Sequence, residues 1–137
     1  YDADLVIWFH TEDRMIHPYE RIRQMIGEGK EMEAVVCYND QIAVQVIKAL
    51  QDLGRKVPED VSVTGYDNSY IANSGGMKLT TIAHPQEKLG EMAAQLLIDL
   101  IQNKESEVKQ KKIEIEPELI LGTSCCKRRN SQETKYV

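Results

Sequence analysis

Short apolar runs alternate with amphipathic helical segments along this chain, and this alternation restricts the fold more than any other feature. Runs rich in β-branched or aromatic residues cover 5–9, 34–38, 61–66 and 79–82. Apolar residues at helical spacing cover 18–26, 40–53 and 86–102. Strands that alternate with helices form a layered α/β fold, and continuous apolar runs indicate parallel strands covered on both faces. With 137 residues, the chain is therefore predicted to form one α/β domain with a parallel sheet.

The composition limits the partners of this segment. Its 17 basic and 22 acidic side chains give a net charge of −5. That balance argues against direct contact with nucleic acid, since phosphate binding needs clustered Lys and Arg. No apolar run approaches the roughly 18 residues that a membrane-spanning helix requires, so no membrane contact is expected. The chain begins without a signal-peptide pattern or an initiator Met, and we expect it to be part of a longer protein.

The three cysteines indicate a reducing compartment. Cys37 lies in a predicted buried strand, and Cys125 and Cys126 are neighbours, which close a disulfide only with strain. No Cys or His pair has the spacing of metal ligands. We therefore expect three reduced thiols, no metal site and a cytoplasmic location.

Polar and aromatic side chains follow three of the predicted strands, at the edge where open α/β sheets bind ligands. The strand ends carry Phe9-His10, Tyr38-Asn39-Asp40 and Tyr66-Asp67-Asn68. Amide and carboxylate groups form paired hydrogen bonds with adjacent hydroxyls, and aromatic faces cover the C–H surface of a sugar. This combination of residues suits a neutral polyhydroxylated ligand.

Each of these residues also has a purely structural interpretation. Asp40 is more typical of a helix N-cap than of a ligand, and Asn68 suits a turn as well as a contact. The tyrosines are more often packing residues than binding platforms. From spacing alone, Asn39 and Asp67 fit ligand contact and loop chemistry equally well.

The order and spacing of several motifs resemble the effector domain of lactose- and galactose-type sugar-responsive repressors, over about residues 34–121. The motifs are Tyr38-Asn39-Asp40-Gln41-Ile42-Ala43, Gly65-Tyr66-Asp67-Asn68 and Leu79-Thr80-Thr81-Ile82. The Cys-Tyr-Asn-Asp run and the His84-Pro85 step are similar to the arabinose-responsive repressors of Bacillus-like bacteria, which add a winged-helix DNA-binding module. The resemblance implies a periplasmic-binding-protein-like (type I) α/β fold.

The resemblance also implies roles for individual residues. Asn39 and Asp67 match sugar-hydroxyl ligands, and His84 falls at the hinge between two lobes, close to the sugar. A hinge histidine that contacts only protein is an equally good interpretation of His84. Phe9 or His10 lies where the family often places an aromatic side chain over the sugar ring. No catalytic residue, metal or cofactor is implied.

In that family two lobes close over the sugar, and this chain corresponds to the second. We expect 1–82 to form the second lobe, 83–112 the hinge and a helix that crosses to the first lobe, 113–124 a returning strand, and 125–137 a disordered tail. The first lobe is missing from this chain, so the apolar stripe of the crossing helix is expected to fold back or to pair with another copy. Sugar binding by this segment alone should be weak.

The function implied is sugar sensing by a homodimeric, non-enzymatic transcriptional repressor. Binding of a sugar, expected to be L-arabinose, would release the parent protein from operator DNA, which is contacted only through a module absent from this chain. An extracytoplasmic sugar carrier with the same fold is one alternative. Another is a magnesium-dependent phosphoryl-transfer enzyme that uses Asp13, Asp40 and Asp67, although the sequence has no glycine-rich phosphate loop.

Overall fold

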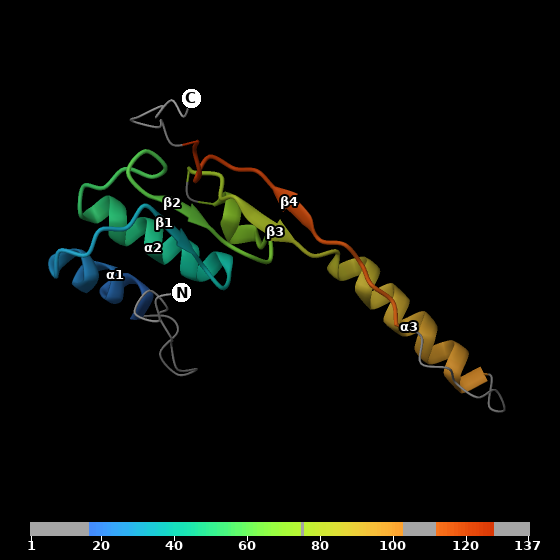
Figure 1. Ribbon diagram of the computed structural model, residues 1–137. Coiled ribbons are helices and arrows are strands. Elements are labelled where there is room, and N and C mark those ends of the chain that lie inside the picture. The colour runs from blue at the N-terminus through green and yellow to red at the C-terminus, as the bar shows by residue number, and fades with distance from the viewer. Residues whose placement is uncertain (1–16, 75, 103–111, 128–137) are drawn as a thin grey trace, which may run out of the picture.

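The computed structural model in Figure 1 describes residues 17–74, 76–102 and 112–127. The predicted strand at 5–9, the site candidates Phe9 and His10, and Asp13 of the magnesium alternative lie outside these residues. So do positions 128–137, which make up most of the predicted tail.

The described elements follow the α/β order that the sequence predicts. They are α1 His17–Gly27, β1 Ala34–Val36, α2 Asp40–Asp52, β2 Ser62–Thr64, the 3-10 helix η2 Tyr70–Asn73, β3 Thr81–Ala83, α3 Gln86–Gln102 and β4 Glu118–Ile120. The three predicted helices are confirmed to within a residue. Their ends follow local chemistry, since Pro18 stands in the first turn of α1 and Gly54, with φ of +74°, follows the end of α2.

The strands form two two-stranded sheets that a single bridge connects. β1 and β2 pair in parallel, with Ala34 opposite Ser62, and an isolated parallel bridge between Thr64 and Thr80 connects β2 to the segment that leads into β3. β4 pairs with β3 in the antiparallel direction. The returning strand is shorter than predicted, since β4 covers only Glu118–Ile120 of the range 113–124. β3 ends at Ala83.

The hydrophobic core lies between the sheet and two helices. α1 packs against α2, and α2 packs against β2 and η2. Ile22, Leu50, Val63 and Leu79 are almost fully buried there. The opposite face of the sheet is open, since Val36 on β1 is 85% exposed and a groove of about 570 Å³ runs over this face.

Helix α3 projects away from the rest of the structure (Figure 1). None of its residues is buried, and large apolar side chains such as Leu97 (58% exposed) and Ile101 face outward. The apolar stripe of α3 therefore does not fold back on the domain, and pairing with another copy of the chain stays a prediction. None of the helices in the described ranges has both the length and the hydropathy needed to cross a bilayer.

The three cysteines are unpaired, as predicted. Cys37 is buried at the end of β1, whereas Cys126 is exposed. Burial raises the pKa of the Cys37 thiol to about 12, and the nearby Asp40 carboxylate adds to the rise. An unfolded thiol ionises near pH 8.5. Since the folded pKa is the higher one, this group stabilises the native state below about pH 8.5 and loses that contribution as the pH rises toward 12.

We expect a thiol reagent such as iodoacetamide at pH 8 to modify Cys126 readily in the native chain and to leave Cys37 unmodified until denaturant is added, because only a thiolate reacts rapidly. Mass spectrometry of the labelled peptides, with and without denaturant, measures both sites. Equal labelling of the two cysteines in the native chain would contradict the buried position of Cys37.

Candidate functional site

Asn39 and Asp67 follow adjacent parallel strands and reach the same hollow. Asn39 comes between β1 and α2, and Asp67 follows β2. Both line a hollow of about 190 Å³ at the carboxyl edge of the β1–β2 pair. The other lining residues are Gln41, Ser69, Tyr70 and Ile71. The structure therefore brings together the two residues that the sequence singled out first.

Asn39 is the N-cap of α2, a role that the sequence analysis favoured for Asp40. Its backbone is extended, and its Oδ1 accepts a hydrogen bond from the backbone N–H of Ile42 at 2.9 Å. The prediction for Asp40 was wrong because Asp40 is already the first residue of the helix and is fully buried. Capping engages only the carbonyl oxygen of the Asn39 side chain, so the two Nδ2–H donors of the amide take no part in it.

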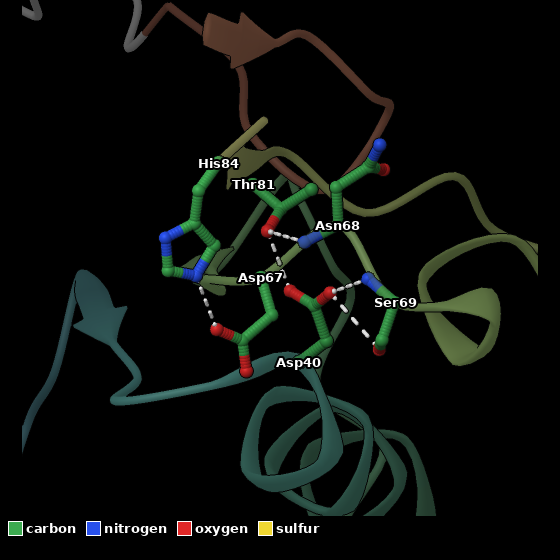
Figure 2. A network of polar contacts seen from close by, with 6 residues as sticks. All are labelled: Asp40, Asp67, Asn68, Ser69, Thr81 and His84. Atoms are coloured by element: carbon green, nitrogen blue, oxygen red, sulfur yellow. Dashed lines mark hydrogen bonds and ion pairs between the residues drawn. The ribbon is translucent and has the colours of Figure 1, made fainter. Parts of the chain in front are cut away.

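Asp40 is the centre of a buried hydrogen-bond network (Figure 2). Its Oδ1 accepts from the Thr81 hydroxyl at 2.5 Å, and its Oδ2 accepts from the Ser69 backbone N–H at 2.7 Å and the Ser69 hydroxyl at 3.1 Å. These bonds join α2 to β3 and to the loop after β2. Because both oxygens are satisfied by protein donors, Asp40 is not arranged as a magnesium ligand.

The loop that carries Asp67 has an unusual backbone. Asp67 has φ of +101° and Asn68 has φ of +48°, a region that residues other than glycine rarely adopt, at a cost of about 1–3 kcal/mol per residue. The surroundings hold this conformation: the Asp67 N–H donates to the Ile82 carbonyl at 2.9 Å, and the Asn68 N–H donates to the Thr81 hydroxyl at 3.4 Å. Asn68 thus forms the turn, and Figure 2 shows its side chain pointing away from Asp67.

His84 contacts Asp67 directly, which sequence reasoning did not anticipate. Its Nε2 lies 3.0 Å from Asp67 Oδ1 (Figure 2). Its ring meets that of Tyr66 edge-on, with 4.7 Å between the ring centroids. His84 stands between β3 and α3. It is not among the residues that line the hollow.

Tyr70 is a lining residue that the sequence analysis did not single out. Its ring is largely exposed at the rim of the hollow, within η2. The available signal was an aromatic residue three positions beyond Asp67. In the described part of the chain, no group of three or more His, Cys, Asp or Glu side chains converges to form a metal site.

The sequence of residues 4–125 matches the periplasmic binding protein-like domain family. The chain belongs to this family. As a periplasmic binding protein-like domain, it is similar to an arabinose metabolism transcriptional repressor from Geobacillus stearothermophilus, with 34% identity over 124 residues, which are 89% of this chain and 34% of that protein. The chain spans about a third of the length of the curated relatives it matches.

Two solved structures illustrate the similarity. A protein of Sanguibacter keddieii described as a LacI-family transcriptional regulator superimposes with a TM-score of 0.80 and 27% identity, over 90% of this chain and 45% of that one. A LacI-family regulator from Enterococcus faecium with bound ribose has a TM-score of 0.65 and 31% identity, over 79% of this chain and 39% of that one.

These similarities confirm two predictions made from the motifs. The fold is that of a periplasmic-binding-protein-like α/β domain, and the chain is part of an effector domain of the lactose- and galactose-type repressor family. The relatives are transcriptional repressors and regulators, not enzymes, which favours the non-enzymatic interpretation over the magnesium-dependent alternative.

Proposed function

We propose that this chain supplies one half of the sugar site of a transcriptional repressor. The observation that carries the proposal is that Asn39 and Asp67, from the ends of two parallel strands, line one hollow. The Asn39 amide offers two N–H donors and the Asp67 carboxylate offers charged acceptors, which together match neighbouring sugar hydroxyls. Tyr70 at the rim offers an apolar ring for the C–H face of a sugar.

The proposed effector is a pentose, with L-arabinose as the first candidate. The name of the Geobacillus relative and the ribose in the Enterococcus structure support this choice. His84 is proposed to stand close to the sugar at the hinge, and Phe9 or His10 to cover the sugar ring, as the family resemblance implies.

The proposed mechanism is sugar-induced release from DNA in the cytoplasm. A sugar that contacts both lobes favours the closed state by its higher affinity for that state. Closure of the lobes in a homodimer changes the spacing of DNA-binding modules that lie outside this chain. The exposed stripe of α3 supports this arrangement, because Leu97 and Ile101 would be covered by the first lobe.

The test is replacement of Asp67 by asparagine in the full-length repressor. Asparagine tolerates the positive φ of this position and has nearly the same shape, so the change removes mainly the charged acceptor. We expect the affinity for L-arabinose, measured by calorimetry, to fall about 10- to 100-fold, since a hydrogen bond to a charged group is worth about 1.5–3 kcal/mol. Operator binding without sugar should be unchanged.

Asp60→Asn is the matched control. Asp60 is an exposed carboxylate near the start of β2, at the opposite edge of the sheet, and asparagine keeps an acceptor for the Lys56 N–H that Asp60 binds at 2.8 Å. This variant should bind sugar like the wild type. Normal sugar affinity and normal release from the operator in Asp67→Asn would remove Asp67 from the site, and titration with D-ribose and D-galactose tests the choice of a pentose.

A further inference from the structure

The two carboxylate oxygens of Asp67 are in different situations. Oδ1 is held by His84 Nε2 at 3.0 Å. No hydrogen bond to Oδ2 is seen from the residues that the structure describes, and the side chain borders the hollow. The histidine therefore fixes one end of the carboxylate and leaves the other for a ligand.

His84 is itself held in place. The edge-on contact with Tyr66 limits rotation of its ring. The Asp67 N–H donates to the Ile82 carbonyl at 2.9 Å, which ties together the two backbone segments that carry Asp67 and His84. The imidazole thus approaches the carboxylate from a fixed position.

His84 also contacts the start of α3 through its backbone. Its carbonyl accepts the N–H of Gln86, the first residue of α3, at 2.8 Å. His84 therefore contacts the Asp67 carboxylate with its side chain and the first residue of α3 with its main chain.

The contact contributes little to folding. The His84 and Asp67 side chains are 37% and 40% exposed, and polar contacts between side chains this exposed stabilise proteins weakly. This contact joins a strained, polar loop to the base of a projecting helix. Because it adds little stability, we attribute it to ligand binding.

We propose that His84 is a positioning residue for Asp67. His84 orients the Oδ2 atom of Asp67 toward the sugar and links occupancy of the hollow to the base of α3. The inference rests on the proposed function and deepens it, because it assigns His84 a role through Asp67 in place of a direct sugar contact.

The first experiment uses the 137-residue chain without sugar. The ring nitrogens of His84 are followed by ¹⁵N nuclear magnetic resonance in the wild type, in Asp67→Asn and in the control Asp60→Asn. Loss of the charged acceptor should shift the His84 Nε2 resonance, and the control should leave it in place. An unchanged Nε2 resonance in Asp67→Asn would overturn the inference, independently of any result on sugar binding.

The second experiment is a double-mutant cycle on sugar affinity in the full-length repressor. His84→Leu should weaken sugar binding about 3- to 30-fold, which lies within the range of coupling between neighbouring residues. The same change in an Asp67→Gly background, where glycine accepts the positive φ, should change the affinity by less than about twofold. His84→Gln keeps an N–H donor of similar reach and should recover most of the affinity.

The outcomes separate the two proposals. Equal losses from His84→Leu in both backgrounds would make His84 a direct sugar ligand and overturn the positioning role. A loss of thermal stability in His84→Leu with no change in sugar affinity would make His84 a structural residue. That result would also overturn the positioning role. Normal sugar affinity in both Asp67→Asn and Asp67→Gly would instead reject the proposed function itself.

Discussion

Replacing Asp40 by alanine is expected to lower the free energy of unfolding by about 3–5 kcal/mol, because three hydrogen-bond donors lose their shared charged acceptor. The side chain is fully buried and accepts hydrogen bonds from the Thr81 hydroxyl and from both the N–H and the hydroxyl of Ser69. Alanine leaves the buried Thr81 hydroxyl and the half-buried Ser69 donors without this acceptor, and a buried donor left unsatisfied costs about 1–3 kcal/mol. Urea denaturation followed by circular dichroism measures the loss.

Two further variants make the Asp40 result interpretable. Asp40→Asn keeps the shape and one oxygen acceptor, so its loss should be clearly smaller than that of alanine. Glu59→Ala removes an exposed carboxylate from the turn before β2 and should change stability by no more than about 0.5 kcal/mol. If Asp40→Ala were as mild as Glu59→Ala, the network in Figure 2 would not hold the Asp67 loop.

The local features of this fold were predictable because they depend on nearby residues. Apolar periodicity located the helices, and the parallel arrangement of β1 and β2 follows from strand–helix–strand order. The same reasoning placed Asn39 and Asp67 at one edge of the sheet. Their meeting in one hollow is therefore a consequence of topology, which the sequence pattern encodes.

The remaining features depend on residues far apart in the chain. Asn39 and Asp40 are both good capping residues, and what separates them is the burial of Asp40 against Ser69 and Thr81, which are 29 and 41 positions away. The contact of His84 with Asp67 spans 17 positions. Propensity and periodicity report on neighbours only, so they do not reveal such pairs.

Replacing Gly122 by alanine is expected to lower the free energy of unfolding by about 2–3 kcal/mol, the cost of forcing extra atoms into a packed site. A Cβ at this position would lie 2.5 Å from the Leu79 carbonyl carbon and 2.6 Å from its oxygen, and would also collide with the Lys78 carbonyl oxygen. These are backbone atoms, so no side chain can rotate out of the way. The clash separates the segment after β4 from the segment before β3.

That separation would break a set of hydrogen bonds around β2. The Gly122 N–H donates to the Thr80 hydroxyl at 3.1 Å, and Ser124, two residues on, accepts from the Val63 N–H at 2.9 Å and donates its hydroxyl to the Val63 carbonyl at 2.6 Å. Amide hydrogen exchange should therefore accelerate at Val63 in Gly122→Ala. The same substitution at Gly27, where a Cβ meets nothing within 4 Å, should leave both stability and exchange unchanged. If the two variants behave alike, the segment after β4 is not packed against the segment before β3.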